Sequence, residues 1–288
     1  MYSTNKKKLY YLLPLLIPWL FITGGILFTL LQSFNFLNPV AGKVGFSGYI
    51  RIYSNLFFWK SMGFSIYIAL ISSFFSVVAG FFIAVLFWRL PASWRNKVVF
   101  YKIFLILPHI SVAYLVILMF SRTGLLSSIF TGLGLISGYE EFPVMIFDNG
   151  GRGIILGYLL KEIPFAILMV SALLYRIPEN QILSARMLGA SRLYTLKRVV
   201  LPEALPAITS TFFILFLYSF GGFEMPFILG GSKPVMISIR VYDLLFRKGF
   251  EYRAEAMAAL ISIFVINLLC ILFFMGVSKK IKIRRALL

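Results

Sequence analysis

Six long apolar stretches constrain this chain more than any other feature of its sequence. A transmembrane helix needs about 20 mainly apolar residues to cross a hydrocarbon core roughly 30 Å thick. Each stretch has 22 to 26 residues: Tyr10–Gln32, Gly63–Trp88, Phe100–Ser121, Gly153–Leu174, Ala204–Leu229 and Ala254–Ser278. Composition agrees, because only 13% of the residues are charged, whereas soluble domains carry about a quarter. The sequence therefore predicts an all-α integral membrane protein with six transmembrane helices.

The basic residues predict the orientation of these helices. Lys and Arg number 28 against 10 Asp and Glu, which gives a net charge of +18. They gather in short runs between apolar stretches, a pattern typical of membrane proteins and not of nucleic-acid binding. Both ends are basic, with KKK at 6–8 and KKIKIRR at 279–285. Because basic residues favour the cytoplasmic side, we expect both termini there, in a multi-pass protein of the cell (plasma or inner) membrane.

The sequence gives no support to a cleavable signal peptide, to ATP binding by this chain or to a metal site. The first stretch is too long for a cleavable signal peptide, so we expect it to remain as a signal-anchor helix. The chain has no glycine-rich phosphate loop, so it is predicted to bind no ATP itself. One histidine, His109, and one cysteine, Cys270, cannot form a metal cluster. We therefore expect no enzyme activity, no metal and no cofactor in this chain, with His109 as a packed or water-contacting residue.

One predicted inner loop has a helical pattern of its own. It reads RIPENQILSARMLGASRLYTLKRVVLPEALPAI from Arg176 to Ile208. Pro178 can open a helix, and Gly189 can permit a sharp change of direction after it. A second amphipathic piece follows, and Pro202 marks the entry to the next span. We expect two short helices joined at Gly189, a rigid knob suited to a groove on a soluble partner.

This loop resembles the cytoplasmic coupling loop of binding-protein-dependent (type I) ABC importer permeases. In that family Glu-Ala-Ala is followed by three residues, Gly, nine residues, Ile, one residue and Leu-Pro. Here Gly189 is followed by nine residues and then Val199, Val200 and Leu201-Pro202. The matching positions are Ala185, Gly189, Ala190, Ser191, Arg192, Leu201 and Pro202; the departures are Leu183 for Glu, Ser184 for Ala, and Leu188 at a frequently acidic position.

The resemblance has wider implications. It implies the type I permease fold over 60–278, after an N-terminal tail, first helix and outer segment at 1–59 and before a basic tail at 279–288. The stretch FGGFEMPFILGG at Phe220–Gly231 is similar to permeases of the polyamine, iron and phosphonate branch. The implied partners are a second permease subunit (a paralogue or a copy), two ATPase subunits that use ATP and Mg, and an extracytoplasmic solute-binding protein. The 178–202 loop would couple the chain to the ATPase.

Three charges inside the predicted spans are candidates for the translocation path. Charged side chains in a membrane usually face a bundle interior or a water-filled route. Lys161 and Glu162 lie near the middle of the fourth span, where an interhelical hydrogen bond or salt bridge is the alternative role. Glu224 follows Gly221 and Gly222 in the fifth span, a combination that can break a helix; there it is either a path residue suited to a cationic substrate or a packing hydrogen-bond acceptor.

Two alternative functions remain for comparison. An ion-coupled secondary transporter would work without an ATPase. This alternative predicts inverted repeats and several midplane charges, and the sequence shows no such repeat. A membrane-embedded enzyme would need clustered His, Asp or Cys. The sequence favours an ABC importer permease that forms the substrate path.

Overall fold

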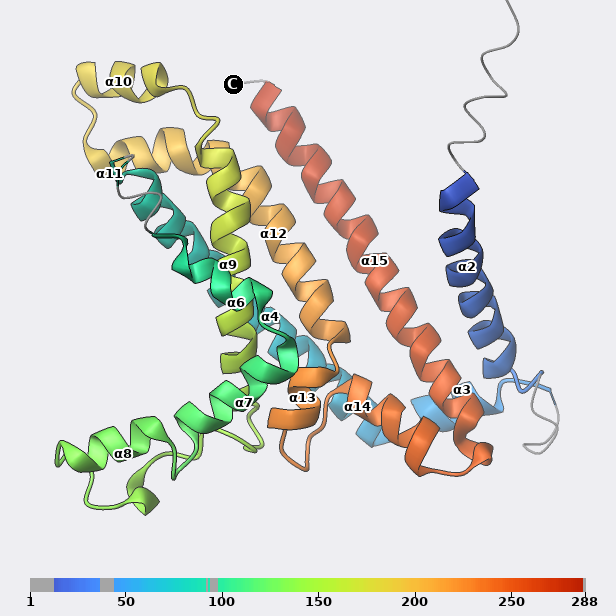
Figure 1. The fold of residues 1–288 in the computed structure, drawn as a ribbon. Helices are drawn as coiled ribbons and strands as arrows, with labels where there is room; N and C mark the ends of the chain where they lie inside the picture. The colour runs from blue at the N-terminus through green and yellow to red at the C-terminus, as the bar shows by residue number, and fades with distance from the viewer. Residues whose placement is uncertain (1–12, 37–43, 92, 94–97, 287–288) are drawn as a thin grey trace, which may run out of the picture. The chain divides into compact units, whose positions relative to one another are not determined.

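The computed structural model describes residues 13–36, 44–91, 93 and 98–286, and its regular elements there are helical (Figure 1). Within these residues six segments are long and apolar enough to cross a membrane: Leu16–Ser33, Leu56–Trp88, His109–Gly132, Arg152–Leu174, Arg192–Gly221 and Phe250–Lys279. Six membrane helices are therefore confirmed. Lys6–Lys8 and the predicted start of the first span at Tyr10 lie outside the described residues.

The chain forms two compact units. Unit 1 comprises 1–59 and 240–266, and unit 2 comprises 60–239 and 267–288. In unit 1, α3 (Ser47–Tyr53) packs against the start of α15 (Arg253–Ala286). A Cβ at Gly48 would lie 2.8 Å from the Ala254 carbonyl oxygen, so a larger residue would separate these helices. Arg51 pairs with Glu255 at 3.4 Å, and the Tyr53 and Ser262 hydroxyls lie 2.8 Å apart.

Three long helices form the centre of unit 2: α4 (Leu56–Trp88), α9 (Arg152–Leu174) and α12 (Leu201–Gly221). Gly80 of α4 faces Ala166 of α9 so closely that an added Cβ would overlap the Ala166 methyl group. Small residues at such contacts let membrane helices approach and gain van der Waals contact, since lipid offers no hydrophobic driving force. Val77, Ala166 and Leu215 form a small buried cluster between the three helices.

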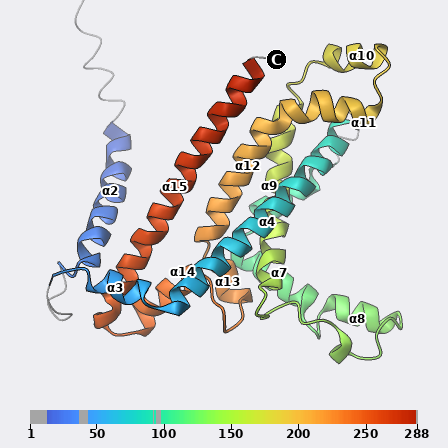
Figure 2. The ribbon, with the colours of Figure 1, turned by 180° about the vertical axis from the view of Figure 1, so that it is seen from behind.

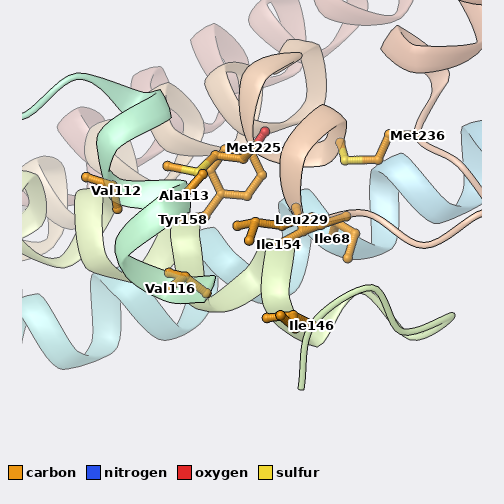
Figure 3. Packing of buried hydrophobic residues seen from close by; sticks show 10 residues of the cluster. All are labelled: Ile68, Val112, Ala113, Val116, Ile146, Ile154, Tyr158, Met225, Leu229 and Met236. Atoms are coloured by element: carbon orange, nitrogen blue, oxygen red, sulfur yellow. The ribbon is translucent and has the colours of Figure 1, made fainter. Parts of the chain in front are cut away.

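At one end of unit 2, a second buried cluster joins the long helices to shorter ones. It contains Ile68, Val112, Ala113, Val116, Ile146, Ile154, Tyr158, Met225, Leu229 and Met236 (Figure 3). These residues fix α7 (His109–Phe120) and α13 (Glu224–Leu229) against α4 and α9. At the other end lie α10 (Glu179–Met187), α11 (Arg192–Thr195) and the C-terminal end of α15, as both views show (Figures 1 and 2).

Two predicted spans are interrupted. The prediction of one helix over Phe100–Ser121 is wrong, because α6 (Ile103–Ile106) ends before an extended Leu107 (ψ 135°) and α7 starts after Pro108. A residue before proline is forced away from the helical region, which explains the break. The fifth span ends as α12 at Gly221, and α13 begins at Glu224 after Gly222 (ψ 140°). The helix break expected there from the glycine pair is confirmed.

Several other boundaries differ by a few residues. The second span begins at Leu56 instead of Gly63, and α2 spans Leu13–Ser33. The last helix, α15, continues to Ala286, so much of the predicted basic tail at 279–288 has a helical backbone. The region between α7 and α9 contains α8 (Leu125–Gly132) at the end of unit 2 away from α10 (Figures 1 and 2).

Candidate functional site

The bend at Gly189 is a helix-ending hydrogen-bond motif. Gly189 has φ +82°, the left-handed region that glycine adopts without penalty. Its N–H donates to the Arg186 carbonyl at 2.9 Å, and the Ala190 N–H donates to the Ala185 carbonyl at 3.0 Å. These two bonds define a Schellman motif, which satisfies the last carbonyls of α10. The Schellman motif therefore explains the spacing of Ala185, Gly189 and Ala190 in the loop.

The chain re-enters a helix immediately after the bend. The Ser191 side chain accepts a hydrogen bond from the Tyr194 N–H at 3.2 Å and so caps α11. Two helices joined at Gly189 are present, but the prediction that the second is short is wrong, since α11 continues through a π-helical segment (Leu196–Val200) into α12. A proline inside an α-helix clashes with the carbonyl four residues earlier. The wider π turn directly before Pro202 relieves that conflict, which explains how α12 continues past it.

The outermost part of this loop is apolar and exposed. Met187 and Leu188 are 88% and 89% exposed, and Leu183 and Tyr194 are also exposed. Exposed apolar patches on otherwise polar surfaces mark interaction sites. Met187 and Leu188 were not among the residues predicted from the sequence. The available signal was their position directly before the bend glycine, because residues at a helix end project beyond its packed face.

The predicted coupling residues separate into two groups. Gly189, Ser191 and Arg192 are exposed at the bend, with Ala185 and Ala190 partly buried beside them. Leu201 instead packs against a buried cluster that includes Val200 and Ala204. Pro202 lines a hollow of about 530 Å³ together with residues of α10, and a second hollow of about 440 Å³ lies between α10, α11 and the end of α4.

Lys161 stabilises the broken third span. It is 9% exposed, and its ammonium group donates to three carbonyl oxygens, those of Phe104 (2.9 Å), Leu105 (3.2 Å) and Leu107 (2.7 Å). Carbonyls at the end of a helix have no partner within that helix. Lys161 therefore satisfies the end of α6 where the chain turns at Pro108.

Glu162, its neighbour, is bound within the bundle. It is 1% exposed and accepts hydrogen bonds from three serine hydroxyls. Ser72 (3.3 Å) and Ser76 (2.8 Å) belong to α4, and Ser219 belongs to α12. The carboxyl group thus joins α4, α9 and α12, as a buried polar group must when it has no water to bind. This geometry is that of the interhelical hydrogen-bond alternative.

Glu224 lies in a half-exposed polar junction. Its carboxylate is 3.3 Å from Nδ1 of His109, and the side chains are 49% and 32% exposed, respectively. The other ring nitrogen of His109, Nε2, is hydrogen-bonded to the Tyr218 hydroxyl. Glu224 begins α13, His109 begins α7, and Tyr218 lies in the last turn of α12. The two broken helices therefore bring their polar ends together, an arrangement that transporters use where a path passes.

A buried tyrosine fixes the break beside this junction. The Tyr158 hydroxyl donates to the Ser219 carbonyl at 3.3 Å, and a Cβ at Gly222 would overlap that hydroxyl. Ser238 donates to the Gly222 carbonyl at 2.6 Å, which satisfies one acceptor freed by the break. Glycine at 222 is required for space.

The structure thus separates the three predicted path residues. Lys161 and Glu162 are buried in structural hydrogen bonds, whereas Glu224 is accessible and is joined by His109 and Tyr218. Sequence reasoning gave His109 no binding role and did not consider Tyr218; the signal for His109 was its place directly after Pro108. In the described part of the chain, no three His, Cys, Asp or Glu residues come together as a metal site.

Comparison with known proteins gives a consistent family. A family model described as "Binding-protein-dependent transport system inner membrane component" matches residues 57–282. The inner membrane ABC transporter permease protein YcjO of Escherichia coli is 26% identical over 91% of this chain and 92% of its own length. The spermidine/putrescine transport system permease protein PotB of Escherichia coli is 26% identical over 66% of this chain and 67% of its own length.

Solved structures share the fold. A chain of a bacterial ABC transporter involved in the import of the acidic polysaccharide alginate matches with a TM-score of 0.80, at 21% identity over 96% of both chains. A chain of the MetNI methionine ABC transporter, in an inward-facing conformation, matches with a TM-score of 0.59 over 77% of this chain and 94% of that one. The resemblance predicted from the loop is confirmed, as are the type I permease fold and the likeness to polyamine permeases.

Proposed function

The chain belongs to the family of binding-protein-dependent transport system inner membrane components, and from this premise we propose how its two sites contribute to import. Family membership makes it a permease subunit of an ABC importer, a multi-pass protein of the inner membrane. The ion-coupled secondary transporter is thereby set aside.

We propose that the α10–α11 loop contacts a partner ATPase. The observation that carries this proposal is the exposed apolar pair Met187 and Leu188, which we call the tip. The tip lies next to the bend between α10 and α11, called the elbow below, whose geometry the Schellman motif at Gly189 fixes. Burial of one such side chain contributes roughly 1.5–3 kcal/mol. Because α11 continues into α12, a movement of the tip would be carried directly to the membrane helix α12. The last turn of α12 contains Tyr218, which belongs to the junction with Glu224 and His109.

The other parts of the proposed complex follow the family. The partner ATPases would bind ATP and Mg, a second permease subunit would complete the path, and an extracytoplasmic solute-binding protein would deliver the substrate. The loop and both termini would face the cytoplasm. In unit 2 the C-terminal end of α15 lies at the same end as α10, which supports a common side for the loop and the C-terminus (Figures 1 and 2).

We propose that substrate passes the junction of Glu224, His109 and Tyr218. Accessibility supports this role, since Glu224 and His109 are half-exposed while Glu162 is not. A carboxylate, an imidazole and a phenol can accept and donate hydrogen bonds to a polar substrate. Lys161 and Glu162 would hold the surrounding helices in place.

The double variant Met187→Ser/Leu188→Ser tests the ATPase contact. We expect uptake and ATPase co-purification to fall on the order of tenfold or more, as for interface anchors. The matched control is Leu133→Ser/Leu135→Ser, two apolar residues that are 69% and 66% exposed at the opposite end of unit 2. Equal ATPase binding by the two variants at equal expression would place the contact elsewhere.

A further inference from the structure

A basic pocket lies beside the proposed ATPase contact. It has a volume of about 440 Å³ and is formed by the end of α4, by α10 and by α11 with the segment that follows. In both views the C-terminal end of α4 reaches α11 next to α10 (Figures 1 and 2). All three walls belong to unit 2. We call it the arginine pocket, after Arg89, Arg186 and Arg192, one from each wall.

The arginine pocket carries a strong positive charge. None of the eight described residues that line it is acidic. Within the part of the chain that the structure describes, its three arginines make no ion pair. The neighbouring hollow of about 530 Å³ differs, because it is lined by Arg198 together with Glu203. Three guanidinium groups around one pocket favour a bound anion, and arginine matches phosphate in a planar, bidentate manner.

The position of the pocket along the membrane normal indicates where that anion comes from. Trp88 lines the pocket and is the last residue of α4, a predicted membrane span. Tryptophan is enriched at the membrane–water interface, the level of the lipid headgroups. Ile182, Leu183 and Val200 add apolar surface beside the arginines. Phosphate-sized charge next to apolar surface is the chemistry of a phospholipid headgroup and its glycerol, and basic pockets between membrane helices bind such headgroups on the cytoplasmic side.

We propose that the arginine pocket binds the phosphoryl group of an anionic phospholipid of the inner leaflet. This assignment rests on the proposed cytoplasmic position of the loop. An acidic side chain of the ATPase is less suited, since α4 and α10 wall the pocket. Of the exposed apolar residues named above, only Leu183 lines it, and Met187 and Leu188 do not. A bound lipid would join α10 to the end of α4 and hold the elbow in one orientation.

The test compares two variants of the assembled transporter that remove the same charge. Arg89→Gln/Arg186→Gln removes two pocket arginines, and Arg176→Gln/Lys279→Gln removes two exposed basic residues outside both hollows. Each complex is reconstituted in nanodiscs of phosphatidylcholine with phosphatidylglycerol and released into detergent. Retained lipid is then measured by native mass spectrometry, and thermal stability is measured with and without inorganic phosphate.

We expect the control to retain phosphatidylglycerol and the pocket variant to lose it. Equal retention by both variants would overturn the proposal. Stabilisation of the control but not the pocket variant by inorganic phosphate, with equal lipid retention, would make the ligand soluble phosphate and overturn the lipid assignment. Loss of ATPase from the pocket variant with lipid retained would identify an acidic ATPase residue as the occupant. Lipid retention does not depend on the Met187–Leu188 contact, so a failure of either proposal is distinguishable.

Discussion

The ammonium group of Lys161 lies 2.7 Å from the carbonyl oxygen of Leu107, the residue at which the helix predicted over Phe100–Ser121 breaks. Two further carbonyls accept from the same group, so one side chain satisfies the end of α6. A membrane interior provides few other donors for a freed carbonyl. The break at Pro108 and the lysine of the fourth span are therefore one structural feature.

Lys161→Met tests this role by removing the charge while keeping the length of the side chain. A hydrogen bond to a charged group contributes about 1.5–3 kcal/mol, so we expect a loss of about 2 kcal/mol or more. Thermal unfolding of the purified protein should show an apparent midpoint lower by about 4–8 °C. Lys102→Met is the control, since Lys102 is exposed. Equal midpoints for the two variants would contradict the assignment.

The sequence predicts the helix count well and the breaks unevenly. Length and hydropathy suffice to find six spans, because each signal is local to about 20 residues. The glycine pair at 221–222 indicated the fifth-span break. The third-span break was missed, since Pro108 constrains only Leu107 locally, and the group that makes the break stable, Lys161, is 54 residues further along the chain.

The two candidate sites also differ in how far they could be predicted from the sequence. The bend at Gly189 was predictable because a Schellman motif involves only neighbouring residues. The junction of His109, Glu224 and Tyr218 was not, because His109 and Tyr218 are 109 residues apart. The buried role of Glu162 likewise depends on serines that lie 86 and 57 residues away.

Gly222→Ala should destabilise the break in the fifth span. Gly222 has φ −63°, which alanine adopts freely, so the cost arises from crowding, and chiefly from overlap with the Tyr158 hydroxyl. Overpacking of this kind costs typically about 1–3 kcal/mol. Fluorescence-detected size-exclusion chromatography after heating should show a smaller folded fraction for this variant.

A second substitution identifies the cause. Adding Tyr158→Phe to Gly222→Ala removes the overlapping oxygen and should restore part of the folded fraction; the ring carbon at 3.1 Å remains close. Gly221→Ala is the control, because nothing lies within 4 Å of a Cβ there. If the double variant were no more stable than Gly222→Ala, the overlap would not be the cause.

Glu224→Gln and His109→Gln test the proposed substrate path. Both changes preserve approximate shape and remove a titratable group from the half-exposed junction. We expect uptake by the reconstituted transporter to fall about tenfold, the effect of losing roughly 1.4 kcal/mol of contact energy, while basal ATP hydrolysis continues. Glu140→Gln, at an exposed glutamate of the 139–141 helical turn, is the control. Uptake equal to that control would leave Glu224 and His109 with structural roles only.

Labelling of single cysteines tests the orientation. In a Cys270→Ser background, a membrane-impermeant maleimide added to intact cells should modify Glu140→Cys or Lys233→Cys and leave Lys279→Cys unmodified. Glu140 and Lys279 are exposed in the structure, so burial does not explain a difference between them. After the cells are opened, Lys279→Cys should react. The reverse pattern in intact cells would invert the topology and place α10 outside.

Gly189 provides the sharpest test of coupling, because the structure separates its conformation from its surroundings. A Cβ at Gly189 would meet nothing within 4 Å, while φ is +82°. Within this chain, any cost of a substitution therefore arises from the backbone. Valine is strained in this region by about 1–3 kcal/mol, whereas asparagine tolerates it.

We expect Gly189→Val to insert in the membrane normally but to lose uptake and substrate-stimulated ATP hydrolysis, since the Schellman bonds at Arg186 and Ala185 would no longer fix the elbow. Gly189→Asn should keep most of both activities. Expression, uptake and ATPase rates of the two variants are measured in parallel. Equal loss in both would show that the bend needs a bare backbone for the partner's approach, and normal transport by Gly189→Val would remove the elbow from the coupling route.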